Sequence, residues 1–226
     1  FELGYLGRRG RELLDTTREI IVDVDFQGIG RIGTESSRGQ VRSRNTGPRP
    51  RWWADLCGRK GFGMEDRGKM NVWAYLERLG LEPDHLEPNE EVLRLLQRRH
   101  LLTVPFENLD IHWKRPIVLD IGKFYEKIVV NRRGGFCYEL NGLFNELLKA
   151  LGFQTRLISA RVFNGTEHGL EFDHAAIIVT IGDDEFLADV GFGDFTTEPL
   201  RLCLGTEQQD PSGVFIIRRF DDEYFD

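Results

Sequence analysis

Cysteine is scarce in this sequence, and no long uninterrupted apolar run occurs. The three cysteines, Cys57, Cys137 and Cys203, are widely separated and form no Cys-X-X-Cys pair. This argues against a disulfide framework or a zinc ribbon and favours a reducing compartment. No apolar stretch approaches the roughly 20 residues that a membrane-spanning helix needs. The first residues also lack the basic-then-apolar pattern of a signal peptide. We therefore expect a cytoplasmic protein with no membrane partner.

The histidines likewise lack the spacing of a metal site. None of His85, His100, His112 and His168 forms a pattern such as His-X-X-X-His, so we expect no bound metal. The sequence places His100 on a helix surface and His168 in a glycine-flanked loop. These four are the weaker candidates for chemistry.

The charge of the chain is unevenly distributed. Residues 1–69 carry 14 Lys and Arg against 10 Asp and Glu, whereas the whole chain of 226 residues carries 30 against 37. The acidic remainder argues against nucleic acid as the main partner. The length and a hydrophobic content of 40% are sufficient for a substantial core.

Residues 1–69 show little pattern of a folded domain. Glycine and arginine recur without a period, and only residues 19–26 alternate like a strand. A disordered arm, a small accessory domain and translated sequence upstream of the true start are the three alternatives. We favour the last, because Met70 opens a well-patterned helix.

From Met70 the pattern predicts helices. Asn89 is placed to cap a helix over residues 90–102, and Asp120 a short helix after it. A two-glycine turn then leads into an amphipathic helix that Gly152 ends. The apolar stripe of this helix consists of Leu140, Leu143, Phe144, Leu147, Leu148 and Leu151.

After Gly152 the period changes toward two. Residues 155–163 read as a strand, and residues 172–181 and 185–190 read as a hairpin around a Gly-Asp-Asp turn. Residues 214–220 predict another strand whose partner begins at residue 223. Helices followed by an antiparallel sheet predict an α+β fold.

Cys137 is the strongest candidate nucleophile. It lies in the first turn of a predicted helix, where free backbone N–H groups and the helix dipole favour a thiolate. Arg132 and Arg133 lie just upstream and would act in the same direction. The glycine turn leaves room for a substrate, and its N–H groups could hold an oxyanion.

His174 and Asp189 lie on the two arms of the predicted hairpin. Pairing them directly would place the turn at residues 181–182, and both would then face the same side of the sheet. A carboxylate on one imidazole nitrogen raises the basicity of the other, which a cysteine nucleophile needs. Singly, each residue has an ordinary structural explanation. Together with Cys137 they predict a thiol enzyme.

Four stretches resemble signatures of the arylamine N-acetyltransferases. Residues 132–139 read Arg-Arg-Gly-Gly-Phe-Cys-Tyr-Glu and resemble the active-site signature of that family. Residues 103–109, Thr-Val-Pro-Phe-Glu-Asn-Leu, resemble its first-domain motif. Residues 173–174, Asp-His, and 189–193, Asp-Val-Gly-Phe-Gly, resemble its histidine segment and third signature. The resemblance covers the chain from about Met70 onward.

The resemblance implies a fold and a division of the chain. It implies a helical bundle over residues 70–152, and an antiparallel β-barrel-like domain with a cysteine-protease-like Cys-His-Asp core over 153–199. Residues 200–226 would begin a C-terminal α/β lid that is truncated here. Its loss would expose apolar surface and impair activity.

The implied chemistry is ping-pong acetyl transfer from acetyl-CoA to an arylamine or hydrazine in xenobiotic metabolism. Cys137, His174 and Asp189 would form the catalytic triad. The other residues to which the resemblance gives roles are Gly135, Gly191, Phe192 and Gly193 toward acetyl-CoA, Phe136 and Phe192 as acceptor walls, and Arg133, Glu139, Glu107 and Asn108 as support.

Two other functions remain open at the level of sequence. A transglutaminase-like or peptidase-like thiol hydrolase uses the same Cys-His-Asp order, and a degenerate fragment could bind CoA without turnover. The flanking motifs favour the acetyltransferase. The sequence leaves the acceptor amine and the oligomeric state undetermined.

Overall fold

Local side-chain caps begin two helices at the predicted residues. Asn89 Oδ1 accepts a hydrogen bond from the Val92 N–H at 2.9 Å and begins helix α3, and Asp120 Oδ1 does the same for Lys123 at 2.9 Å in α5. Gly152, at a φ of +93°, follows the end of α6. The computed structural model that shows these contacts describes residues 20–23, 70–83, 86–170, 172–220 and 224–226.

Helical structure extends from Val72 to Ala150. The elements are α2 (Val72–Arg78), α3 (Glu90–Thr103), α4 (Leu109–His112), α5 (Ile121–Tyr125), a π-helical turn η1 (Glu126–Val130) and α6 (Cys137–Ala150). All six residues of the predicted α6 stripe are buried, and they pack with residues of α2, α3 and α5 in one core. An amphipathic helix of this length depends mainly on such packing for its stability.

The strands form one main sheet and a separate hairpin. The main sheet has the order β5-β4-β3-β2-β1-β8, and β6 pairs only with β7. The strands are β1 (Ile20–Asp23), β2 (Gln154–Val162), β3 (His174–Ile181), β4 (Asp184–Ala188), β5 (Leu200–Arg201), β6 (Glu207–Asp210), β7 (Gly213–Ile216) and β8 (Tyr224–Phe225).

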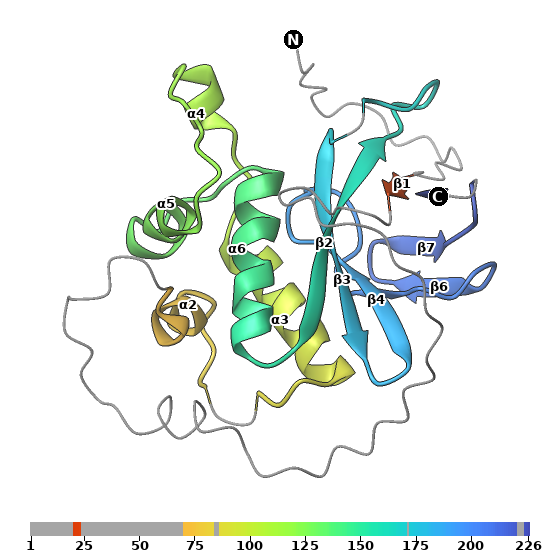
Figure 1. Ribbon diagram of the computed structural model, residues 1–226, viewed down its shortest axis with the longest axis horizontal. Coiled ribbons are helices and arrows are strands. Elements are labelled where there is room, and N and C mark those ends of the chain that lie inside the picture. Colours follow the sequence, from red (N-terminus) through yellow and green to blue (C-terminus); the bar gives the residue numbers. More distant parts are fainter. Residues whose placement is uncertain (1–19, 24–69, 84–85, 171, 221–223) are drawn as a thin grey trace, which may run out of the picture.

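The two faces of the main sheet are covered differently. Figure 1 shows the helices on one side of the sheet and the β6–β7 hairpin on the other. On β3, Ile177 and Val179 pack into the helical core, whereas Ala176 and Ile178 join a second apolar cluster with Leu187. Successive side chains of β3 therefore point into two different apolar cores, one on each face of the sheet. Helices packed on an antiparallel sheet confirm the α+β class.

Three strand predictions need correction. Among the described residues no pairing joins β5 to β8, so the closure of a barrel-like sheet is not seen. Strand β7 pairs with β6, which the sequence did not indicate. Strand β8 pairs with β1. The predicted pairing of residues 214–220 with the segment from residue 223 is present only as an isolated bridge from Arg219 to Phe225. Such long-range partners depend on tertiary packing rather than on local pattern.

Residues 1–69 contribute one described strand. Residues 20–23 form β1, antiparallel to β2, within the predicted stretch 19–26. The rest of this segment, including Cys57, and the turn predicted at residues 221–222 lie outside the described residues. The division of the chain at residues 69, 152 and 199 stays a prediction.

Candidate active site

Cys137 is the first residue of α6, as predicted. The carboxylate of Glu139, two residues later, accepts a hydrogen bond from the Phe136 N–H at 3.1 Å, which satisfies one of the donors at the helix start. Cys137 keeps 8% of its surface exposed. The sulfur therefore lies near a helix N-terminus and retains limited access.

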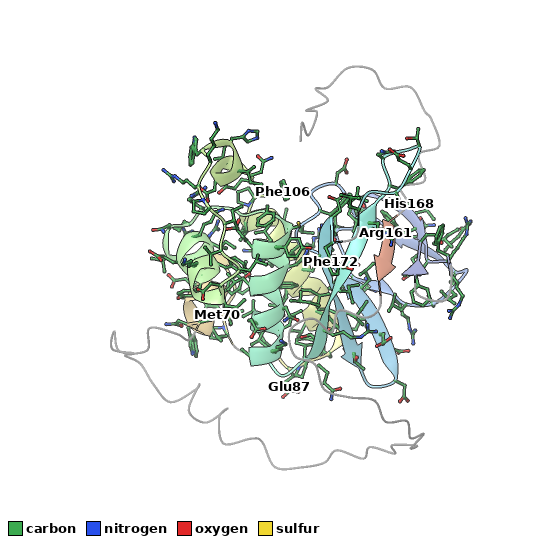
Figure 2. The ribbon with its side chains drawn as sticks, turned by 45° about the horizontal axis from the view of Figure 1, so that its top comes forward. Met70, Glu87, Phe106, Arg161, His168 and Phe172 are labelled. Atoms are coloured by element: carbon green, nitrogen blue, oxygen red, sulfur yellow. The ribbon has the colours of Figure 1, made fainter. Side chains whose placement is uncertain are left out.

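The two motifs around this turn pair through their backbones. The Glu107 N–H donates to the Gly135 carbonyl at 2.8 Å, and Phe106 and Gly135 form a parallel bridge. Figure 2 shows Phe106 near the start of α6. At Gly134 the approach is so close that a Cβ atom would lie 2.0 Å from the Pro105 carbonyl oxygen. Only glycine fits there, so the turn before Cys137 has a definite position.

A cluster of partly buried charges supports the same turn. Lys127 Nζ lies 2.7 Å from Glu139 Oε2 and 2.8 Å from Asp110 Oδ2, and Arg133 Nη2 lies 2.6 Å from Glu107 Oε1. The hydrogen bond from Lys127 lowers the pKa of Asp110. Burial lowers the pKa of Lys127, but its carboxylate partners outweigh that effect and raise it.

The cluster changes two roles that the sequence indicated. Arg133 is paired with carboxylates, so its charge is largely neutralised by those partners rather than directed at Cys137. Glu107, Arg133 and Glu139 do lie together, whereas Asn108 precedes α4 without a capping hydrogen bond from its side chain. Lys127 was missed, because no local pattern shows that a lysine on η1 meets acids from other segments.

Replacing Lys127 by alanine should destabilise the protein by about 3 kcal/mol, because it leaves several largely buried carboxylates without their central cation. Urea titration measures the change in the free energy of unfolding. Lys149→Ala is the matched control, since Lys149 forms an exposed pair with Glu146 at 2.8 Å and its loss should cost less than about 1 kcal/mol. Equal small effects of both variants would contradict the supporting role of Lys127.

His174 and Asp189 are in direct contact. His174 Nε2 and Asp189 Oδ2 are 2.6 Å apart, and each residue is only 3% exposed. The ring of Phe192 lies edge-on to the imidazole, with 5.2 Å between the ring centroids. The imidazole is thus held by a carboxylate on one nitrogen and an aromatic ring beside it.

Cys137 completes this arrangement. Burial lowers the pKa of His174, but the charge and hydrogen bond of Asp189 and a hydrogen bond with Cys137 outweigh it and raise the pKa to about 10. The imidazole therefore favours its charged form between a carboxylate and a sulfur. Gly191 binds Asp189 Oδ1 through its N–H and packs against Cys137, so the three predicted residues come from segments that lie together. Such an arrangement can move a proton to and from the sulfur.

The register that brings His174 to Asp189 differs from the predicted one. Ile177 pairs with Ala188 and Ile181 with Asp184, two positions away from the register that would place His174 directly opposite Asp189. Asp189 lies just beyond the end of β4, and its carboxylate reaches His174 across the open end of the hairpin. The shared face survives because a shift of two residues leaves the alternation of side chains unchanged.

The other predicted site residues are spread over two places. Phe192 and Gly193 line a pocket of about 330 Å³ that also borders Asp189, Arg98 and Thr196. Gly191 packs against the helix start, where a Cβ atom would lie 2.8 Å from Cys137 Cα.

Gly135 and Phe136 lie on the cysteine side of the site instead. Gly135 is engaged with the 105–107 segment, and the ring of Phe136 packs against that of Tyr138 with 5.7 Å between centroids. Neither borders the pocket beside Phe192. The assignment of these residues to the cofactor and the acceptor stays a prediction.

Two buried amides were missed by sequence reasoning. Asn141 bonds to Asp189 Oδ1 at 2.8 Å, and Gln97 Oε1 accepts a hydrogen bond from the Asp189 N–H at 3.2 Å. Asn141 had a usable signal, because it is polar and lies one turn after Cys137 on the same side of α6. Gln97 had no such signal.

The placement of His100 is corrected. It was expected on a helix surface, but it is fully buried, with Nε2 2.8 Å from the Tyr75 hydroxyl. Burial lowers its pKa to about 3, so it packs as a neutral ring.

The part of the chain that the structure describes contains no helix long and apolar enough to cross a membrane. Within that same part, no three acidic, histidine or cysteine side chains gather as a metal site would require.

Comparisons with known proteins point in one direction. The profile of a family described as N-acetyltransferase matches residues 90–225. An arylamine N-acetyltransferase/N-hydroxyarylamine O-acetyltransferase of Salmonella typhimurium is 42% identical over 144 residues, which are 63% of this chain and 51% of that protein. An arylamine N-acetyltransferase of Escherichia coli is 38% identical over 60% of this chain and 49% of its own length.

Solved structures agree. The arylamine N-acetyltransferase of Salmonella typhimurium superposes with a TM-score of 0.62 at 35% identity, over 70% of this chain and 64% of that one. The Mycobacterium marinum enzyme in complex with CoA gives 0.63 at 33% identity, over 68% and 59%. The chain spans about half the length of the curated relatives that it matches.

Proposed function

This chain belongs to the arylamine N-acetyltransferase family, and from that premise we propose that it transfers an acetyl group from acetyl-CoA to an arylamine or hydrazine through Cys137. The observation that carries the proposal is the 2.6 Å contact of His174 with Asp189, whose Oδ1 binds the N–H of Gly191, the residue that packs against Cys137 at the start of α6. A relative of known structure was solved with CoA, which supports acetyl-CoA as the donor.

The first half-reaction forms a thioester on the enzyme. The sulfur of Cys137, its proton held by His174, attacks the thioester carbonyl of acetyl-CoA. The carbon–sulfur bond to CoA then breaks, and the departing CoA thiolate takes the proton from His174. Backbone N–H groups in the first turn of α6 would stabilise the transient oxyanion. Asp189 keeps the imidazole oriented throughout and stabilises its charged form whenever His174 carries the additional proton.

The second half-reaction transfers the acetyl group to the acceptor. The amine nitrogen attacks the acetyl carbon, His174 accepts the proton that the nitrogen loses, and the bond to Cys137 breaks to give an amide and the free sulfur. Ping-pong kinetics are the consequence, because CoA leaves before the acceptor reacts.

Other residues would act through binding and support. Phe192, Gly193 and Gly191 would border the entry of the acetyl and pantetheine groups, with Gly135 close to the sulfur. Phe136 and Phe192 would contact the acceptor ring. The charged cluster of Arg133, Glu139 and Glu107 would hold the turn that carries Cys137.

Incubation with acetyl-CoA followed by mass spectrometry tests the proposal. The peptide that contains Cys137 should gain one acetyl group and lose it when an arylamine is added. Iodoacetamide should block the gain, because alkylation of the Cys137 sulfur removes the nucleophile. Hydrolysis of a peptide or amide without any acetyl adduct would instead identify a thiol hydrolase. Binding of CoA without an adduct would identify an inactive fragment.

A further inference from the structure

Asn141 is a buried polar residue one turn after Cys137 on the helix that carries the nucleophile. It follows Cys137 by four residues, so both side chains lie on the same side of α6. Its side chain is completely buried. A buried amide is costly unless its donors and acceptor are all satisfied, so its partners indicate what it is there to do.

The partners of Asn141 come from the two segments that carry the rest of the triad. Its Nδ2 donates to the Ala175 carbonyl at 2.6 Å and to Asp189 Oδ1 at 2.8 Å. Its Oδ1 accepts from the Val190 N–H at 2.9 Å. Ala175 directly follows His174, and Val190 directly follows Asp189. One side chain thus links the nucleophile helix to both neighbours of the catalytic pair.

The contacts of Asp189 show what this linkage controls. Asp189 Oδ2 meets His174, while Oδ1 receives the Asn141 amide and the Gly191 N–H at 2.8 Å. Because both carboxylate oxygens of Asp189 accept hydrogen bonds, the carboxylate cannot rotate without breaking hydrogen bonds inside a buried site. Its orientation toward the imidazole is therefore determined from α6, the same helix that presents the sulfur.

We propose that Asn141 is a positioning residue that holds the His174–Asp189 pair in place relative to Cys137. This inference rests on the proposed acetyl transfer for its effect on rate. Asn141 touches none of the reacting atoms, and it acts through Asp189 and the backbone beside His174.

Asn145 provides a matched control on the same helix. It lies one further turn along α6 and is 1% exposed. Its side chain makes partly buried hydrogen bonds, accepting from Thr155 Oγ1 at 2.7 Å and donating to Glu146 Oε1 at 3.0 Å. None of these partners belongs to the triad. A merely structural role of Asn141 would make Asn141→Ala and Asn145→Ala behave alike.

The rate of acetylation of Cys137 by acetyl-CoA in a single turnover separates the two roles. Asn141→Ala should slow it by about 10- to 100-fold, as loss of a supporting hydrogen bond does at other sites, whereas Asn145→Ala should change it by less than about threefold. A near-isosteric second variant, Asn141→Asp, should also be slow at neutral pH, because it lacks the amide donors and places a second carboxyl group beside Asp189. Near-normal rates in either folded Asn141 variant would overturn the proposal.

Titration of the His174 imidazole by NMR gives a readout that needs no acetyl transfer. His174 faces Asp189 after β4 and Cys137 on α6, and the alignment of Asp189 contributes to its high pKa. Asn141→Ala should lower that pKa by about one unit or more, and Asn145→Ala should leave it unchanged. If the unaltered protein is not acetylated, the proposed function fails while this titration still decides the role of Asn141. An unchanged titration, or unfolding of both Asn141 variants while Asn145→Ala stays folded, would mean a structural role only.

Discussion

Replacing Cys137 by alanine is expected to abolish acetylation of an arylamine, with a loss of at least about 10⁴-fold, because no other group can form the thioester. The fold should persist, since Cys137 is a small residue whose removal leaves a small cavity. The measurement is acetylated product from acetyl-CoA and an arylamine, alongside circular dichroism of the variant.

Cys203→Ala is the control for this experiment. Cys203 is also a free cysteine, but it follows β5 rather than beginning a helix, and it is only partly buried. It should retain nearly full activity. If Cys137→Ala kept more than about 1% of the activity, the reaction would not pass through this sulfur.

Asp189→Asn should lower the rate of Cys137 acetylation by about 10³- to 10⁴-fold. The amide preserves the shape but removes the charge that holds His174 in its charged, correctly oriented form. The matched control is Asp184→Asn, because Asp184 is an ion-paired carboxylate at the far end of the same hairpin, bonded to Arg201. That variant should keep its rate within about twofold. Equal losses in both variants would indicate damage to the hairpin rather than to the triad.

The same substitution should change how stability depends on pH. The pKa of His174 rises from an ordinary 6.5 to about 10 in the folded protein, so the charged imidazole stabilises the fold fully below pH 6.5. That contribution is lost as the pH rises toward 10. In Asp189→Asn it should be much smaller at every pH. Urea titrations at pH 6 and pH 9 should therefore show a larger gap between the two proteins at pH 6, and a constant gap would contradict the high pKa.

Features that depend on neighbours in sequence were predictable. The caps at Asn89 and Asp120 act within three residues, and the stripe of α6 repeats at helical spacing, so local pattern was sufficient. The position of Cys137 at a helix start follows from the same kind of signal. Even the shared face of His174 and Asp189 was predictable, because it depends only on the parity of the alternation.

Contacts between distant segments were decided by the tertiary structure. The register of β3 and β4, the pairing of β6 with β7, and the burial of His100 depend on packing that no local pattern encodes. The gathering of acids around Lys127 is of the same kind. The sequence by itself determined which groups can react and which helix and strand carry them. Only the tertiary structure determined the orientation of those groups relative to one another, because a hydrogen bond such as that from Asn141 to Asp189 joins residues 48 positions apart.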